Sequence, residues 1–164
     1  MRLRVAGLVE ESVADGPGLR FTVFVQGCGH GCSGCWNPQT HQRDGGTLME
    51  VGMLAERIRE NPLLDGLSLS GGEPFDQPEA CGELAEWARA AGLHVMAWTG
   101  YTFEQLTGPE GTSDRLRLLR SLDLLVDGPF ILELRSLELP WRGSANQRVL
   151  DVPLSLARGA PVAC

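Results

Sequence analysis

The sequence has 164 residues, 43% of them hydrophobic and 21% charged, which predicts a single domain over residues 1–164 with its own hydrophobic core. Its formal net charge is −7, so we expect no nucleic acid partner, because phosphate binding requires a basic face. All basic residues are arginines, which excludes a lysine Schiff base and a Walker-type phosphate loop. Without a membrane-length apolar run or a secretory signal, we expect a cytoplasmic protein with no membrane partner.

Apolar runs typical of strands alternate with amphipathic runs typical of helices. Strands are predicted at residues 20–26, 67–70, 93–98, 123–126 and 147–152, and helices at residues 47–60, 76–91, 102–106 and 114–122. The first of these helices would begin with a capping box of Thr47 and Glu50, and the second with Asp76 as its N-cap. Residues 130–141 show no clear pattern. Repeated strand–helix–strand units predict an α/β fold with a mostly parallel sheet, whose ligands bind at the carboxyl ends of the strands.

The most informative segment is the glycine-rich stretch 27–37, directly after the first predicted strand. It contains Cys28, Cys32 and Cys35 in the spacing C-x3-C-x2-C. Three clustered cysteines among an odd total of five, without a secretion signal, indicate metal binding rather than disulfides. The same spacing would also place three apolar residues on one face of a helix. The four glycines in the stretch argue against that helix, since each disfavours it by about 1 kcal/mol.

Two kinds of metal centre fit this segment. A structural zinc ion needs four nitrogen or sulfur ligands, and His30 or His41 could be the fourth, although a second cysteine or histidine pair is missing. An iron–sulfur cluster held by three thiolates would leave one iron without a protein ligand. An open coordination position is the mark of a reactive site, and nitrogen and oxygen donors of a second molecule could fill it.

Two segments together resemble the radical S-adenosylmethionine superfamily. The first is the C-x3-C-x2-C spacing directly after a predicted strand. The second is residues 70–74 (S-G-G-E-P), which resemble the GGEP motif of that family. The resemblance implies a [4Fe–4S] cluster and S-adenosylmethionine as cofactors. The amine and carboxylate of S-adenosylmethionine would chelate the open iron, and one electron would then cleave the molecule to methionine and a 5′-deoxyadenosyl radical. Glu73 could accept a hydrogen bond from the ammonium group of the cofactor.

Four further segments narrow the resemblance. Residues 15–20 (D-G-P-G-L-R) resemble the entry segment of glycyl-radical-enzyme activases. Residues 98–102 (W-T-G-Y-T), 126–130 (V-D-G-P-F) and 142–147 (R-G-S-A-N-Q) resemble segments of the activating proteins of anaerobic (class III) ribonucleotide reductases. In the wider superfamily an aromatic residue often precedes the third cysteine, whereas here Gly34 precedes it and Trp36 follows it. That departure is also found in the reductase activators, where the aromatic is usually tyrosine.

This resemblance assigns roles to the candidate site residues. The cluster would be bound by Cys28, Cys32 and Cys35. S-adenosylmethionine would be flanked by Gly34, Cys35 and Trp36, with Gly72 and Glu73 at its methionine end and Thr99 as a weaker candidate. No catalytic residue is expected beyond the cluster and the cofactor. We assign no role to Cys81, Cys164, His30, Asp15 or Asp127, for which packing, local hydrogen bonding or turn formation is an equal explanation.

The chain is short for a complete barrel of the superfamily. We therefore expect an incomplete (partial) radical S-adenosylmethionine βα barrel with a mostly parallel sheet of about five to six strands. Its open side would be covered by a protein partner, which the resemblance implies is the large glycyl-radical reductase subunit, with an electron donor of flavodoxin or ferredoxin type. The alternatives are a radical enzyme acting on another glycyl-radical enzyme, a peptide or a small molecule, and a metal-binding module without catalysis.

Overall fold

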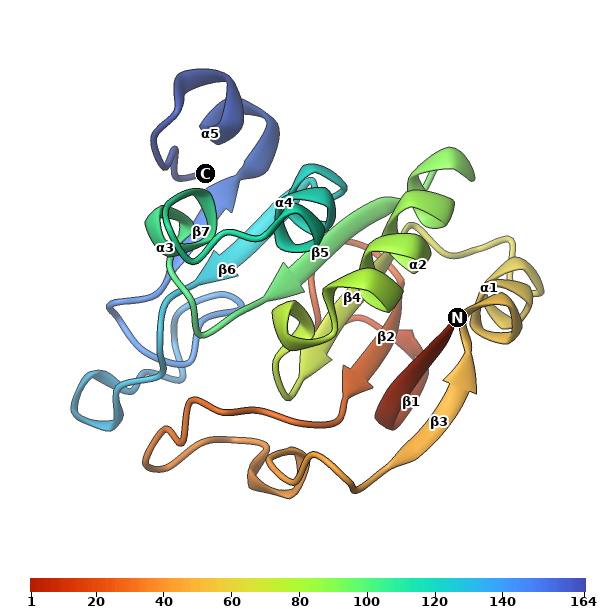
Figure 1. Ribbon diagram of the computed structural model, residues 1–164, viewed down its shortest axis with the longest axis horizontal. Coiled ribbons are helices and arrows are strands. Elements are labelled where there is room, and N and C mark those ends of the chain that lie inside the picture. Colours follow the sequence, from red (N-terminus) through yellow and green to blue (C-terminus); the bar gives the residue numbers. More distant parts are fainter.

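The computed structural model describes residues 1–164 as one seven-stranded sheet with five α-helices (Figure 1). The strands are β1 (Arg2–Ser12), β2 (Arg20–Val25), β3 (Thr47–Glu50), β4 (Gly66–Gly71), β5 (His94–Trp98), β6 (Leu124–Asp127) and β7 (Arg148–Asp151). The helices are α1 (Val51–Arg59), α2 (Pro78–Ala90), α3 (Phe103–Thr107), α4 (Ser113–Arg120) and α5 (Val152–Arg158). No helix is long and apolar enough to cross a bilayer.

The sheet is mixed and open, with the strand order β3-β1-β2-β4-β5-β6-β7. Strands β2, β4, β5 and β6 pair in parallel, whereas β1 is antiparallel to β2 and β3, and β7 is antiparallel to β6. The predicted α/β class is confirmed. The expected five to six strands are too few, because the sheet gains antiparallel strands at both of its edges. A partial barrel is not confirmed, since the order describes an open sheet.

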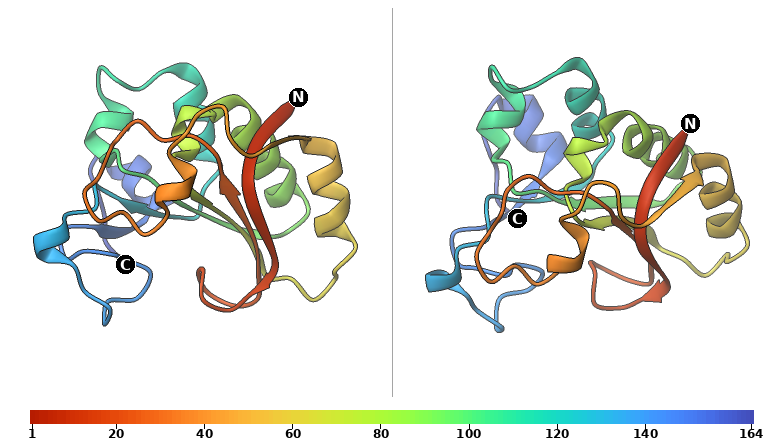
Figure 2. Two further views of the ribbon diagram at one scale, coloured as in Figure 1. Left: turned by 90° about the horizontal axis from the view of Figure 1, so that it is seen from below. Right: turned by 60° about the horizontal axis from the view of Figure 1, so that its bottom comes forward.

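The core lies between the sheet and helices that pack on one of its faces (Figure 2). Helix α2 packs against α1 on one side and α4 on the other. Its buried side chains include Ala80, Cys81, Leu84, Ala85 and Ala88, spacings that place apolar side chains along one helical stripe. Cys81 is therefore a packing residue, fully buried in the core. This layer fixes the central parallel strands, and hence the loops at their carboxyl ends.

Three predicted element boundaries are wrong. Residues Thr47 to Glu50 form strand β3 rather than the start of a helix, because they pair with β1, a strand that the sequence patterns did not reveal. Asp76 ends a 3₁₀ turn, and Gln77 is the N-cap of α2 with Pro78 in its first turn, a favoured place for proline. The last predicted strand ends at Asp151, whose side chain accepts a hydrogen bond from Leu154 N and caps the unpredicted helix α5.

Candidate functional site

Four loops meet at one edge of the sheet. They follow the parallel strands β2, β4, β5 and β6, whose arrowheads in Figure 1 point to the same edge. The loop after β2 contains the three clustered cysteines and passes beneath that edge. Because ligands of parallel sheets bind at the carboxyl ends of the strands, this edge is the candidate site, as the sequence predicted.

Main-chain hydrogen bonds join the cysteine loop to the turn after β4. Gly72 N donates to Val25 O over 2.8 Å, and Glu73 N donates to Gly27 O over 2.8 Å. A Cβ atom added at Gly72 would lie only 2.4 Å from Gly27 O. Glycine at this position is therefore required by the close approach of the two loops.

A cavity of about 110 Å³ brings most of the predicted site residues together. The residues that line it include Cys28, Cys32, Cys35, Gly72, Glu73 and Thr99, together with His30 and His41. The three cysteines are free thiols of intermediate exposure. Burial raises the pKa of the Cys28 thiol to about 11, so a cation is needed to hold it as a thiolate near neutral pH.

The arrangement of the thiols bears on which metal group fits. No three histidine, cysteine, aspartate or glutamate side chains converge tightly enough to hold a single metal ion. The cysteines instead lie around the cavity that they share. Zinc requires four ligands that converge on one point, whereas the thiolates of an iron–sulfur cluster each bind a different iron. Three soft thiolate donors around one cavity fit an iron–sulfur cluster.

Glu73 occupies the centre of this edge, and its carboxylate is buried. Its Oε1 accepts hydrogen bonds from Phe75 N (3.0 Å) and Thr99 Oγ1 (2.8 Å). Its Oε2 accepts from Gly100 N (2.8 Å) and lies 2.6 Å from His30 Nε2. The hydrogen bond to Glu73 raises the pKa of His30. Sequence reasoning missed this pair; the one available signal was the position of His30 between two candidate ligands.

A second polar cluster adjoins His30, and the sequence patterns did not reveal it. Tyr101 packs edge-on against the His30 ring, with 4.6 Å between the ring centroids. The Tyr101 hydroxyl donates to Asp76 over 2.8 Å, and Arg115 Nη2 donates to that hydroxyl over 2.9 Å. This network fixes the loop after β5 against the turn after β4, and so positions the wall of the cysteine cavity.

The two aspartates left without a role support the loops around the site. Asp127 is buried and accepts hydrogen bonds from Phe103 N (2.7 Å) and from the Arg148 guanidinium. Asp15 Oδ2 accepts from the hydroxyls of Ser12 (2.6 Å) and Thr22 (3.2 Å). Loop formation thus accounts for Asp127, whereas Asp15 also lines a larger cavity beside the cysteines.

This larger cavity, of about 500 Å³, is lined by Cys35 and Trp36 among others. Gly34 lines neither cavity. It has a left-handed backbone (φ 73°), and a Cβ atom added there would lie 2.8 Å from Leu132 Cδ1. The candidate residues around Cys35 are thus divided: Gly34 lies close to Leu132 outside both cavities, whereas Trp36 is part of the wall of the larger cavity.

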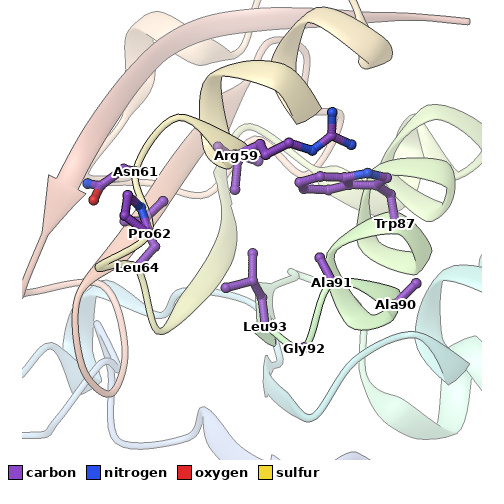
Figure 3. Close-up of a pocket in the computed structure, with 10 residues that line it drawn as sticks. Arg59, Asn61, Pro62, Leu64, Trp87, Ala90, Ala91, Gly92 and Leu93 are labelled. Atoms are coloured by element: carbon purple, nitrogen blue, oxygen red, sulfur yellow. The ribbon is translucent and has the colours of Figure 1, made fainter.

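A third cavity, of about 530 Å³, lies where α1 and α2 end (Figure 3). The Arg59 guanidinium extends over the Trp87 ring, 5.5 Å from its centroid, and Leu64 and Leu93 also line the cavity. None of its lining residues comes from the cysteine loop or from the loops after β4, β5 and β6. It therefore plays no part in the candidate site.

Comparisons with known proteins agree with this geometry. Residues 14–150 match the 4Fe-4S single cluster domain family. The crystal structure of QueE from Escherichia coli is similar in fold, with a TM-score of 0.50 and 16% identity over 77% of this chain and 71% of that one.

Curated relatives are similar over most of their length. The anaerobic ribonucleoside-triphosphate reductase-activating protein of Salmonella typhi is 34% identical, over 84% of this chain and 91% of that protein. The proteins of the same name from Vibrio cholerae and Enterobacteria phage T4 are 38% and 35% identical, each over 82% of this chain and over 89% and 85% of their own lengths. The chain therefore belongs to the family of anaerobic ribonucleoside-triphosphate reductase-activating proteins.

Proposed function

We propose that the chain activates an anaerobic ribonucleoside-triphosphate reductase by reductive cleavage of S-adenosylmethionine at a [4Fe–4S] cluster. When bound, the cluster supplies the electron that splits S-adenosylmethionine into methionine and a 5′-deoxyadenosyl radical, which takes a hydrogen atom from a glycine Cα of the reductase and leaves a glycyl radical. The observation that carries the proposal is the single cavity shared by Cys28, Cys32, Cys35 and the G-G-E turn. Membership of the reductase-activating family supports the choice of partner.

The chain's own residues hold and orient the reactants in this proposal. The thiolates of Cys28, Cys32 and Cys35 would hold the cluster, and S-adenosylmethionine would bind beside them through its amine and carboxylate. Trp36, half exposed beside Cys35, flanks the cofactor, and the G-G-E turn lies at its methionine end. The Thr99 hydroxyl donates a hydrogen bond to Glu73, so Thr99 acts on the cofactor through the position of that carboxylate.

Protein partners complete the reaction. The large glycyl-radical subunit of the reductase provides the target glycine, and a cytoplasmic donor of flavodoxin or ferredoxin type provides the electron. When hydrogen transfer takes place inside the assembled complex, water is excluded and the radical is protected from side reactions. A partner that covers the open edge of the sheet would supply this protection, because the two cavities beside Cys35 are both open to the surface.

Anaerobic reconstitution with iron and sulfide tests the proposal directly. We expect about four irons and four sulfides per chain, and loss of the cluster when Cys28, Cys32 or Cys35 is replaced by alanine. Cys164→Ser is the matched control, since this exposed cysteine lies outside both cavities. The reduced protein, mixed with S-adenosylmethionine and the reductase, should produce a glycyl radical that is visible by electron paramagnetic resonance.

Two other results would reject parts of the proposal. One zinc per chain without cleavage of S-adenosylmethionine would leave a metal-binding module without catalysis. Cleavage of S-adenosylmethionine with a radical on another glycyl-radical enzyme, a peptide or a small molecule, but none on the reductase, would keep the chemistry and remove the assigned partner.

A further inference from the structure

Arg115 lines neither cavity beside the cysteines, yet hydrogen bonds connect it to the centre of the site. It belongs to α4, which packs beside α2 (Figure 1), and its side chain is only 19% exposed. It lies in the first turn of its helix, where the helix dipole disfavours a positive charge. A largely buried arginine at this end of a helix calls for an explanation by the groups that it contacts.

The Arg115 guanidinium holds the turn after β4. Its Nε donates to Phe75 O over 2.9 Å, and its Nη2 donates to Asp76 Oδ1 over 3.1 Å. Phe75 is fully buried, and its own N–H donates to Glu73 Oε1 over 3.0 Å. The carbonyl and the N–H group of Phe75 thus connect Arg115 to the carboxylate of Glu73.

The same guanidinium also holds the loop after β5. Its Nη2 donates to the Tyr101 hydroxyl over 2.9 Å, and its central carbon lies 4.4 Å from the centroid of the Tyr101 ring. Tyr101 N donates to Thr99 Oγ1 over 3.1 Å, and Thr99 Oγ1 donates to Glu73 Oε1 over 2.8 Å. Arg115 therefore reaches Glu73 along two separate paths, one through each loop.

Both paths end on the same oxygen of Glu73. Oε1 accepts from Phe75 N and Thr99 Oγ1, whereas His30 from the cysteine loop lies against Oε2. His30 makes no hydrogen bond with Arg115 and packs only against the Tyr101 ring. The network that begins at Arg115 thus holds Oε1 independently of His30, the donor on the cavity side of the carboxylate.

We propose that Arg115 is a positioning residue for S-adenosylmethionine: it fixes Glu73 through both loops while Oε2 exchanges His30 for the ammonium group of the cofactor. The inference rests on the proposed function, in which the G-G-E turn lies at the methionine end of the cofactor. Arg115 touches neither the cofactor nor the cluster and acts through Glu73. Small displacements of a positioned group are costly, since about 1 Å can change a rate by roughly a hundredfold.

The geometry of the contacts explains why the residue is an arginine. A planar guanidinium donates in several fixed directions at once, which a lysine ammonium on a flexible stem does not reproduce. Arg117, on the same helix, shows the contrasting case. Its Nε and Nη2 each donate to Glu86 over 2.7 Å, and both side chains are exposed. That pair joins α4 to α2 without any contact to the loops of the site.

Arg115→Met tests the role, with Arg117→Met as the matched control on the same helix. Arg115→Lys keeps the charge without the planar donors, and Tyr101→Phe removes only the hydroxyl of one path. Iron content and urea unfolding are measured for each variant. The dissociation constant of S-adenosylmethionine is measured by calorimetry on the cluster-loaded chain without a reductant, so that the cofactor stays intact. Cleavage kinetics with a reductant then give kcat and KM.

We expect Arg115→Met to raise the dissociation constant and the KM for S-adenosylmethionine about tenfold, the loss of one hydrogen-bonded charged group. Its kcat and iron content should stay at the wild-type values, because the residues that hold the cluster are unchanged. Arg115→Lys and Tyr101→Phe should cause smaller increases in the dissociation constant. Arg117→Met should lower stability slightly and leave the affinity for the cofactor unchanged.

A double-mutant cycle with Glu73→Gln separates positioning from general loss of stability. If Arg115 acts through Glu73, adding Arg115→Met to Glu73→Gln should change the dissociation constant by less than about twofold. An equal effect in both backgrounds would overturn the proposal, and so would equal affinities of Arg115→Met and Arg117→Met. If Arg115→Met failed to hold the cluster, unchanged affinities in Arg115→Lys and Tyr101→Phe would overturn it. The absence of S-adenosylmethionine binding and cleavage in the wild-type chain would instead refute the proposed function.

Discussion

His30 Nε2 lies 2.6 Å from Glu73 Oε2, which connects the cysteine loop to the turn after β4. The other donors to this carboxylate come from Phe75, Thr99 and Gly100. A carboxylate has about four acceptor sites, and the chain uses all of them. An ammonium group can therefore reach Glu73 only by replacing one donor. His30 is the donor on the cysteine loop, and its side chain is partly exposed.

Replacement of Glu73 should destabilise the fold as well as the site. Glu73→Ala would leave the main-chain N–H groups of Phe75 and Gly100 and the Thr99 hydroxyl without an acceptor in a buried position. Because an unpaired buried donor costs roughly 1–3 kcal/mol, we expect the free energy of unfolding of the cluster-free chain to fall by about 3 kcal/mol. Urea denaturation measures this change.

Two variants make the comparison specific. Glu73→Gln keeps one oxygen as an acceptor, so its loss should be smaller than that of Glu73→Ala. Glu110→Ala removes an exposed carboxylate in a loop, and its stability should stay within about 0.5 kcal/mol of the wild type. If all three variants were equally stable, Glu73 would have no structural role.

Replacement of Arg20 should lower the stability of the fold by a similar amount, although arginine is a charged residue. Its guanidinium is fully buried and donates to Ser68 Oγ, Leu67 O and Pro17 O over 2.9–3.0 Å. It thereby fastens the D-G-P-G-L-R entry turn to β4. Lysine cannot reproduce this planar set of donors, so we expect Arg20→Lys to lower the free energy of unfolding by about 3 kcal/mol.

Arg120→Lys is the matched control for Arg20→Lys, because Arg120 is exposed and its guanidinium makes no hydrogen bond within the chain. Urea unfolding of the two variants side by side isolates the effect of burial. If Arg20→Lys lost no more unfolding free energy than Arg120→Lys, a positive charge without the planar set of donors would be sufficient to stabilise the fold at position 20.

His94 should make the stability of the fold depend on pH. Burial and the nearby Arg20 guanidinium lower the pKa of His94, and Arg20 Nη1 lies 3.0 Å from His94 Nδ1. Below the ordinary value of about 6.5, the unfolded chain binds a proton that the folded chain does not. The contribution of His94 to stability is therefore lost as the pH falls through about 6.5.

The comparison with His94→Gln isolates this contribution. The raised pKa of His30 gives a slope of opposite sign, but that slope is common to both proteins. The difference in unfolding free energy between wild type and variant, measured by denaturation from pH 5 to 8, should rise with pH. A difference that does not change with pH would rule out His94 as the source.

The cysteine loop and the G-G-E turn could be predicted to meet because each follows a strand of a parallel sheet. Their motifs are local, and β2 and β4 have clear apolar patterns. The start of the first helix could not be predicted in this way. Thr47 and Glu50 have the spacing of a capping box, but their strand pairing depends on β1, about 45 residues away in the chain. The long-range pairing overrides the local preference.

The contacts inside the site were also beyond sequence patterns. The His30–Glu73 pair joins side chains 43 residues apart, and neither a period nor a motif indicates which donors meet a buried carboxylate. Residues 130–141 had no apolar pattern because they form no helix or strand apart from the 3₁₀ turn Leu132–Leu134. Individual side-chain bonds, such as the one that Ser144 Oγ accepts from Ile131 N, fix their path instead.

Gly34 provides a test of how the loop between β6 and β7 supports the cysteine loop. Gly31 and Gly34 both have a left-handed backbone, at φ 62° and 73°. A Cβ atom at Gly31 would meet no atom within 4 Å, whereas one at Gly34 would lie 2.8 Å from Leu132 Cδ1. Both alanine variants should lose about 1–2 kcal/mol from backbone strain, but only Gly34→Ala should also force the Leu132 side chain to shift. We expect fewer irons per chain after reconstitution of Gly34→Ala than of Gly31→Ala, with partial recovery in Gly34→Ala/Leu132→Ala. Equal iron contents in all three variants would show that the contact with Leu132 does not shape the cluster segment.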